Sequence, residues 1–240
     1  MIRFDNVTKT FTGHISALTE ITVEIKDGEF VFLIGPSGAG KTTFLRLLIA
    51  DSHPTHGTIQ VDEWNVNKLP PSDVYKLRRR VGTVFQDFKL LNDRTVFENV
   101  ALGLEILGKT SEQLERRVLD ILGLVGLADK RHYFPIQLSA GELQRTAIAR
   151  AIVAGPGILL ADEPTGNLDP QTAWDILDIL KEIHKIGTTV IMATHNVGIV
   201  NDLHKRTITL EHGKLLRDEE KGKYHVSPRG KGKKDNASHS

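Results

Sequence analysis

The chain has 240 residues, of which 40% are hydrophobic and 25% charged, an ordinary globular composition that is large enough to bury a sizeable core. Its 31 Lys and Arg residues are nearly balanced by 30 Asp and Glu residues, so we expect no nucleic-acid partner gripped through bulk charge. The absence of cysteine excludes a disulfide framework, thiolate zinc sites and a cysteine nucleophile. No apolar run approaches the ~20 residues of a membrane-spanning helix, so any action at a membrane would require another chain.

The chain begins with short β-prone segments. Residues 2–4 and 21–25 are such segments, and the turn residues between the runs predict a small antiparallel sheet. Residues 29–34 form a nearly all-apolar run, which is typical of a strand buried on both faces of a parallel sheet. We expect a helix to follow over residues 41–50.

Further strands are expected where apolar and β-branched residues recur. They cover residues 80–85, 157–161 and 188–193, and a helical pattern through residues 174–184 separates the last two. This alternation predicts a mainly parallel sheet covered by helices. A hairpin over residues 207–217 is expected to close the fold.

A helical segment interrupts this alternation. Residues 96–107 and 111–122 carry helical spacing with no strand between them, which predicts a helical subdomain inserted into the sheet domain. The last residues are rich in Gly, Ser, Lys and Pro and offer little to bury. The expected organisation is an α/β core in residues 1–86 and 157–222, a helical subdomain in residues 87–156, and a disordered basic tail in residues 223–240.

Residues 35–42 fit the phosphate-loop pattern, in which four residues separate a first glycine from Gly-Lys-Thr. Glycines let the backbone curl so that successive N–H groups point inward, and the positive end of the following helix completes an anion cradle. We expect Lys41 to bridge the β- and γ-phosphates of a nucleotide and Thr42 to ligate Mg²⁺. The alternative, a glycine turn with an incidental lysine, does not explain the position between a buried strand and a helix. The predicted cradle consists of Gly35, Pro36, Ser37, Gly38, Ala39, Gly40, Lys41, Thr42 and Thr43.

An apolar strand over residues 157–161 ends in two carboxylates, Asp162 and Glu163. Open α/β sheets hold their ligands at this end of their strands. Read alone, the pattern is merely a strand that leaves the core. Together with the phosphate loop, it suggests that Asp162 holds Mg²⁺ directly or through water and that Glu163 polarises the attacking water.

A second helix start carries a Ser-Gly element. Ser139 and Glu142 are three residues apart before an apolar-periodic segment that runs to about Val153, which predicts a capping box. A capped helix start with small neighbours is also an anion site, so the two interpretations are compatible.

The order of these motifs resembles that of the ATP-binding-cassette (ABC) ATPases: a phosphate loop, Leu-Ser-Ala-Gly-Glu at residues 138–142, then Asp-Glu, then a histidine after the next strand. The resemblance covers residues 1–222. It implies a RecA-like core, ATP and Mg²⁺ as ligands, and ATP hydrolysis. It also implies a homodimer in which each ATP lies between the phosphate loop of one copy and Ser139 and Gly141 of the other.

The same resemblance assigns further residues. Gln86 is similar to the glutamine that senses Mg²⁺ and the γ-phosphate, His195 to the histidine that contacts the γ-phosphate, and Asp169 to an aspartate at the dimer interface. Phe11 stands where the family places an aromatic residue that stacks on adenine. Without the resemblance, His195 would be read as a surface histidine, Asp169 as part of an ordinary turn, and Phe11 as a core aromatic. The implied catalytic residues are Lys41, Gln86, Glu163 and His195, and the implied Mg²⁺ ligands are Thr42, Gln86 and Asp162.

Two residues depart from the family pattern. Ala140 replaces the first glycine of the usual Gly-Gly pair, and Glu142 stands where glutamine is commoner. Alanine accepts right-handed helical geometry but not the positive φ open to glycine, so this departure bears on the geometry of the loop and on the hydrolysis rate.

Residues 163–169 resemble the ABC subgroup of lipoprotein exporters, macrolide exporters and cell-division ATPases, and residues 85–91 and 216–222 are most similar to the cell-division members. This implies that the chain lies at the cytoplasmic face of the plasma membrane, bound to a transmembrane partner. It also implies that the pair activates a cell-wall hydrolase at the division septum. We expect residues 87–107 to receive that partner through Phe88, Leu90, Leu91 and Phe97, unless these side chains belong to the subdomain core.

Three alternatives remain at this point. The chain could be an exporter ATPase for lipoproteins or macrolides, because the cytosolic motifs barely differ. It could be a soluble ATPase of DNA repair or chromosome structure, although such proteins carry long coiled coils and no sustained heptads occur here. A phosphate-loop kinase would leave residues 139–142 unexplained.

Overall fold

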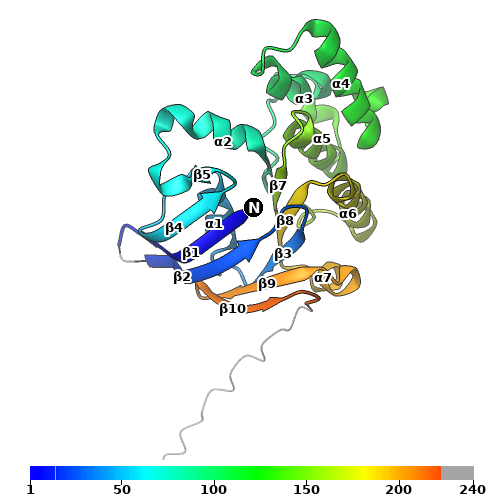
Figure 1. Ribbon diagram of the computed structural model, residues 1–240. Helices are drawn as coiled ribbons and strands as arrows, with labels where there is room; N and C mark the ends of the chain where they lie inside the picture. Colours follow the sequence, from blue (N-terminus) through cyan, green and yellow to red (C-terminus); the bar gives the residue numbers. More distant parts are fainter. Residues whose placement is uncertain (14, 223–240) are drawn as a thin grey trace, which may run out of the picture.

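The computed structural model describes residues 1–13 and 15–222, and the predicted basic tail lies outside this part of the chain (Figure 1). Two sheets and a group of helices form the fold. The predicted fold class is confirmed: a mainly parallel sheet is combined with an antiparallel sheet and with helices.

The antiparallel sheet has the strand order β2-β1-β4-β5. Its first two strands are longer than the predicted segments, and its third strand was not predicted because the sequence over residues 56–61 mixes His, Gly, Thr and Gln with two apolar residues. The ring of Phe4 stacks on that of Phe44 with centroids 4.2 Å apart, which joins this sheet to helix α1 (Lys41–Leu48). The strands are β1 (Ile2–Phe11), β2 (Ile15–Ile25), β4 (His56–Val61) and β5 (Trp64–Asn65).

The larger sheet has the order β10-β9-β3-β8-β7-β6. All its neighbours pair in parallel except the edge strand β10, which forms the predicted hairpin with β9. Strands β3 and β8 are buried along their whole length, so both faces of the sheet are covered. The strands are β3 (Phe30–Ile34), β6 (Val81–Val84), β7 (Ile158–Asp162), β8 (Thr189–Thr194), β9 (Arg206–Glu211) and β10 (Lys214–Glu219).

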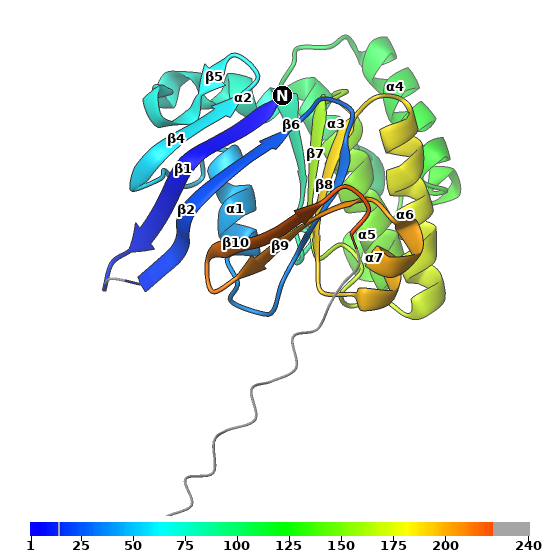
Figure 2. The same ribbon diagram turned by 60° about the horizontal axis from the view of Figure 1, so that its bottom comes forward.

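Helices cover the two faces of the larger sheet, and α1 lies between the two sheets (Figure 2). Helices α3, α4 and α5 stand together in the upper right of Figure 1, and each begins with a capping box, of which the sequence predicted only the last. No described helix is both long and apolar enough to cross a membrane. The helices are α1 (Lys41–Leu48), α2 (Val74–Arg80), α3 (Val96–Glu105), α4 (Ser111–Leu124), α5 (Ala140–Ile152), α6 (Pro170–Lys185) and α7 (Val197–Leu203), with 3-10 turns at Val66–Lys68, Pro71–Asp73, Ala128–Lys130 and Pro135–Gln137.

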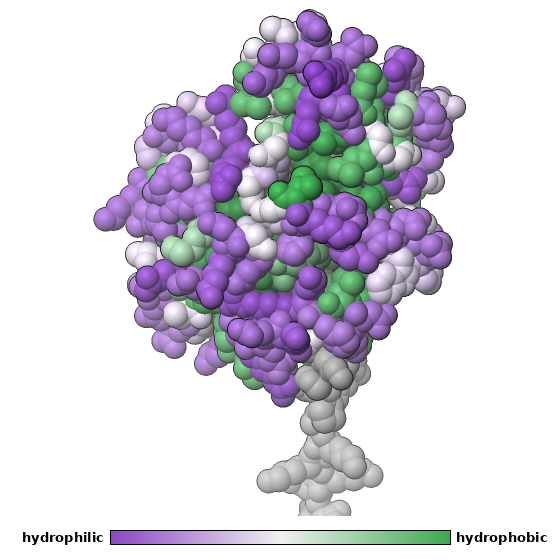
Figure 3. Space-filling model, turned by 45° about the vertical axis from the view of Figure 1, so that its right-hand side comes forward, coloured by the Kyte–Doolittle hydropathy of each residue, from purple (hydrophilic) through white to green (hydrophobic). Residues whose placement is uncertain are grey.

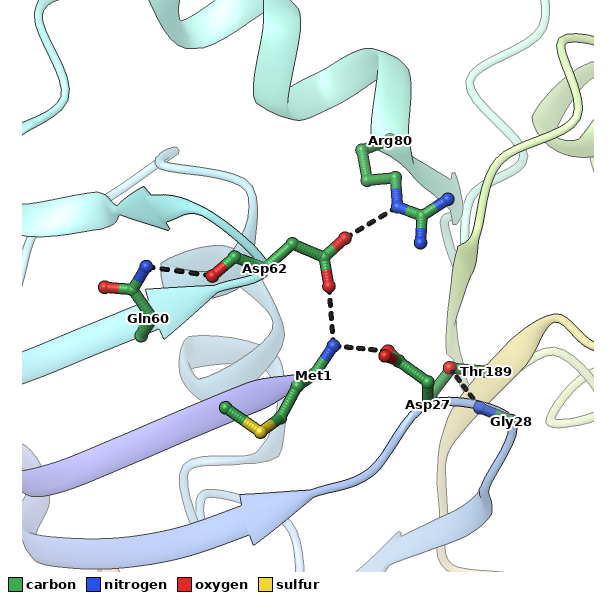
Figure 4. Close-up of polar contacts among 7 residues, drawn as sticks. All are labelled: Met1, Asp27, Gly28, Gln60, Asp62, Arg80 and Thr189. Atoms are coloured by element: carbon green, nitrogen blue, oxygen red, sulfur yellow. Dashed lines mark hydrogen bonds and ion pairs between the residues drawn. The ribbon is translucent and has the colours of Figure 1, made fainter.

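A charged cluster ties the antiparallel sheet to α2 (Figure 4). The α-ammonium group of Met1 forms ion pairs with Asp27, after β2, and with Asp62, after β4. Asp62 also accepts a hydrogen bond of 2.6 Å from Nε of Arg80, the last residue of α2. Burial alone would raise the pKa of Asp62, but the two cations outweigh it and lower the pKa, so the carboxylate stays charged and holds three elements together.

Candidate nucleotide-binding site

The phosphate loop connects β3 to α1 and depends on glycine at two positions. Gly35 has φ of 151°, and a Cβ atom there would lie 2.1 Å from the carbonyl oxygen of Leu210. Gly40, the N-cap of α1, has φ of 105°, and a Cβ atom there would lie 2.5 Å from the carbonyl oxygen of Ala17. Both glycines are therefore needed for backbone packing as well as for any phosphate contact.

Lys41 is held inside this loop. Its side chain is buried, and Nζ donates hydrogen bonds to the carbonyl oxygens of Gly35 at 2.8 Å and Pro36 at 3.3 Å. Oε1 of Glu163 lies 3.6 Å from the same nitrogen. A cation among carbonyl oxygens at the N-terminus of α1 is well placed to attract phosphate.

Asp162 ends β7 and has an unsatisfied oxygen. Its Oδ1 atom is buried and has no hydrogen-bond partner. Burial raises the pKa of Asp162, while a hydrogen bond with Thr42 and the charge of Lys41 act in the opposite direction. An unpaired carboxylate oxygen beside a hydroxyl is the oxygen-rich donor set that Mg²⁺ prefers, so these residues fit the expected ion.

Glu163 lies beside Asp162 in a strained conformation. Its φ is 48°, in the left-handed region that non-glycine residues rarely adopt, and its backbone N–H donates to the carbonyl oxygen of Ala193. Its Oε2 atom accepts a hydrogen bond from the backbone N–H of His195 and lies 2.9 Å from Nδ1 of that ring. The surrounding strands therefore fix the direction of this carboxylate.

A cavity of about 630 Å³ brings most of the predicted residues together. Two of its lining residues, Ala17 and Val197, belong to no motif and could not have been found from the sequence. Gly35 is not in the lining, and neither is Phe11, whose half-exposed ring lies at the end of β1. The lining consists of Ala17, Pro36, Ser37, Gly38, Ala39, Gly40, Lys41, Thr42, Thr43, Gln86, Asp162, Glu163, His195 and Val197.

Phe11 is not a core aromatic, which was the alternative reading of this position. Its ring is 44% exposed, and Nζ of Lys9 lies 5.0 Å from the ring centroid. An exposed ring at the end of β1 is available for stacking.

The Ser-Gly element begins α5, and its capping box is confirmed. Oγ of Ser139 accepts a hydrogen bond from the backbone N–H of Glu142, whose side chain accepts one from the backbone N–H of Ser139. Ala140 is the first residue of the helix and does not have a positive φ, so alanine fits this position. A Cβ atom at Gly141 would lie 2.5 Å from Cγ2 of Thr172, so this glycine lets α5 pack closely on α6.

Three predicted nucleotide contacts, Ser139, Gly141 and Asp169, do not line the cavity. Asp169 instead caps α6 by accepting a hydrogen bond from the backbone N–H of Thr172, and hydrogen bonds from that residue hold the pKa of Asp169 below its ordinary value. Within one chain, these three residues have only structural partners.

Comparison with known proteins identifies the family. The model of the ABC transporter family matches residues 18–166, more than half of the chain. The cell division ATP-binding protein FtsE of Mycobacterium tuberculosis is 52% identical over 225 residues, which cover 93% of this chain and 98% of that protein. The FtsE of Bacillus subtilis is 48% identical over 224 residues, which cover 93% and 98%. The FtsE of Escherichia coli is 46% identical over 215 residues, which cover 90% and 97%.

Solved structures that resemble this chain are also ABC cassettes. The ATP-binding cassette MJ0796, as a dimer in a post-hydrolysis state bound to ADP and Pi, has a TM-score of 0.86 and 36% identity, and the match covers 93% of this chain and 100% of that one. CbiO1 of Clostridium perfringens, part of an ABC transporter complex, has a TM-score of 0.84 and 28% identity, with 91% and 88% covered. The chain therefore belongs to the ABC transporter family, in the FtsE group of cell-division ATP-binding proteins, and is an ATPase.

Proposed function

We propose that the chain hydrolyses Mg-ATP as a homodimer, with each nucleotide between the phosphate loop of one copy and Ser139 and Gly141 of the other. The observation that carries this proposal is the composition of the cavity: it contains the phosphate loop, Gln86, Glu163 and His195, but no residue of 138–142. A second copy would supply the missing wall, and the N-terminal end of its α5 would face the γ-phosphate.

Within one copy, each side chain has a proposed task. Lys41 exchanges its backbone carbonyl partners for the β- and γ-phosphates, and Phe11 stacks on adenine. Glu163 accepts a proton from the attacking water, and His195 orients Glu163 and contacts the γ-phosphate.

Mg²⁺, held by Thr42, Gln86 and Asp162, would supply positive charge that neutralises the phosphates.

The proposed membrane partner, an FtsX-like transmembrane protein, would dock in a groove of about 900 Å³ between α2 and α3. Tyr75 and Ile106 line this groove and are 50% and 65% exposed. Arg78, Arg79 and Lys89 also line it, so a short helix with apolar and acidic side chains would be complementary.

This groove includes part of the predicted segment 87–107, namely Lys89, Leu102, Gly103, Ile106 and Leu107, but not the four side chains that the sequence suggested. Phe88, Leu90 and Phe97 are partly buried and pack against the hydrophobic core, and of the four predicted side chains only Leu91 is exposed. Seen from the side of α6, the surface is largely hydrophilic, with hydrophobic residues gathered in its upper half, at the level of the helical subdomain (Figure 3).

The proposed consequence is that ATP-driven closure is transmitted through this partner to a cell-wall hydrolase, from the cytoplasmic face of the plasma membrane at the division septum. The relatives that share 46–52% of their residues with the chain are named for cell division, which favours this role over export of lipoproteins or macrolides. The longest described helix, α6, has 16 residues, which argues against the long coiled coil of a DNA-repair ATPase.

Mixing two inactive variants tests the shared site. Lys41→Ala removes the phosphate-binding cation, and Ser139→Arg blocks the opposite wall, so each variant alone should be inactive. A mixed dimer contains one site with both elements intact and should regain part of the turnover. Hydrolysis by Ser139→Arg alone, at concentrations where the protein is monomeric, would overturn the proposal. The partner is tested separately by co-purification with an FtsX-like protein.

A further inference from the structure

The loop after Gln86 contains two strained residues in succession. Phe88 has φ of 59° and Lys89 has φ of 53°, both in the left-handed region, and neither is glycine. L-amino acids avoid this region because Cβ approaches the following carbonyl oxygen, and consecutive residues rarely share it. Such a conformation persists only where surrounding groups enforce it.

Arg150 of α5 provides the enforcing contact. Its Nη2 atom donates a hydrogen bond of 2.7 Å to the carbonyl oxygen of Phe88, and its Nη1 atom donates one of 2.6 Å to that of Lys89. The planar guanidinium group presents its donors at fixed angles, so it holds two successive carbonyl groups in one orientation.

The environment of Arg150 makes these bonds hard to replace. Burial lowers the pKa of this guanidinium, and in residues 1–13 and 15–222 no carboxylate forms an ion pair with it. A partly buried cation without a counter-ion depends on its hydrogen bonds more than a fully exposed one does. The two loop carbonyls are therefore its main compensation, and they would be lost if the loop relaxed.

The contact of Arg150 with the carbonyl oxygens of Phe88 and Lys89 lies between two functional regions. Gln86, two residues before Phe88, lines the cavity that contains Thr42 and Asp162. Lys89 and Arg150 line the groove proposed for the membrane partner. The helix that carries Arg150 in its last turn begins beside Ser139, about 16 Å away along its axis.

We propose that Arg150 is a positioning residue that holds the loop 86–89 in its left-handed form and thereby directs Gln86 into the nucleotide cavity. This inference rests on the proposed function of Gln86. It gives α5 a second task, because any shift of the helix would pull on the two carbonyl groups and move Gln86. Within the described part of the chain, the Arg150 side chain donates hydrogen bonds to Phe88 and Lys89 and to no residue of the phosphate loop, so it acts on turnover and not on nucleotide affinity.

The first test is Arg150→Lys, which keeps the positive charge but loses the planar guanidinium group that donates to both carbonyl oxygens. We expect turnover to fall about tenfold, the equivalent of one hydrogen bond to a charged group, and ATP affinity in a fluorescence titration to stay within about twofold. The apparent Mg²⁺ affinity should weaken, because Gln86 is misdirected. Thermal melting checks that the variant is folded, and Arg150→Gln replaces it if Arg150→Lys melts below the assay temperature.

Strain relief distinguishes positioning from packing. Lys89→Gly in the Arg150→Lys background should restore most of the turnover, because glycine adopts positive φ without a clash. Lys89→Ala is the matched control: it removes the same charged side chain but keeps the strain, and should restore nothing. Rescue by alanine as well as by glycine, no rescue by either, or parent turnover in Arg150→Lys would each overturn the proposal.

The proposed function is judged independently. ATP-dependent dimerisation of Glu163→Gln is measured in the Arg150 parent, and its absence would remove the shared-site dimer whatever the Arg150 variants do. If dimerisation is normal and the glycine rescue fails, only the role of Arg150 is wrong.

Discussion

Nδ1 of His195 lies 2.9 Å from Oε2 of Glu163, although the two residues are 32 positions apart in the chain. The contact follows from sheet register. Strands β7 and β8 are parallel neighbours in which Asp162 pairs with Ala193, so the residues just beyond each strand emerge side by side. Both then stand at the carboxyl end of the sheet, where α/β proteins place their ligands.

This contact makes Glu163→Gln an informative change. The amide keeps the shape of the carboxylate but loses the basic oxygen, so ATP binding should persist while turnover falls on the order of 10²-fold or more. Without hydrolysis, Mg-ATP should trap the dimer, which size-exclusion chromatography detects. A protein that stays monomeric in Mg-ATP and turns over at the parent rate would show that Glu163 has another role.

Lys41→Ala should abolish nucleotide binding. The buried cation is held by two carbonyl oxygens of the phosphate loop, and a triphosphate in this water-poor site would lose its neutralising partner. A fluorescence titration with ATP measures the effect. Lys26→Ala, which removes an exposed lysine, is the matched control and should bind normally. Equal affinity of Lys41→Ala and the parent would contradict the site.

The site was readable from the sequence to the extent that its signals are local. The phosphate loop, the carboxylates after β7 and the capping box of α5 each lie within a few consecutive residues, and each follows a buried strand or begins a helix. Strands β4 and β5 and helices α2 and α7 were missed, because short, partly polar segments carry no clear period. The left-handed pair at 88–89 and the packing of Gly141 on Thr172 depend on distant residues, which no local pattern reports.

The groove between α2 and α3 should be the site of the membrane partner. Ile106→Glu places a carboxylate on an exposed apolar position of the groove, and we expect it to abolish co-purification with an FtsX-like protein. Ile186→Glu is the matched control, because Ile186 is 78% exposed and follows α6, outside the groove. ATP affinity should stay within a few fold in both variants. Normal capture of the partner by Ile106→Glu would place the docking surface elsewhere.

Glu142, in the first turn of α5, is a carboxylate at a position where glutamine is commoner in the family. We expect its ion pair with Lys130 to neutralise this extra negative charge. The hydrogen bond from Lys130 and the backbone N–H of Ser139 lower the pKa of Glu142, so this carboxylate is ionised at neutral pH. Its contribution to stability is therefore present above the ordinary pKa of a glutamate and is lost only as the pH falls through the lowered value.

In the proposed dimer, this carboxylate faces the triphosphate bound by the other copy, and Lys130 offsets the repulsion. Lys130→Met should therefore weaken ATP-driven dimerisation about fivefold to tenfold, measured by ultracentrifugation in the Glu163→Gln background. Adding Glu142→Gln should restore dimerisation, because glutamine completes a capping box without charge. Lys130 also lies 5.7 Å from the ring centroid of Tyr133, so a merely structural role is the competing explanation. A loss that Glu142→Gln fails to recover would identify packing, and not charge, as the contribution of Lys130.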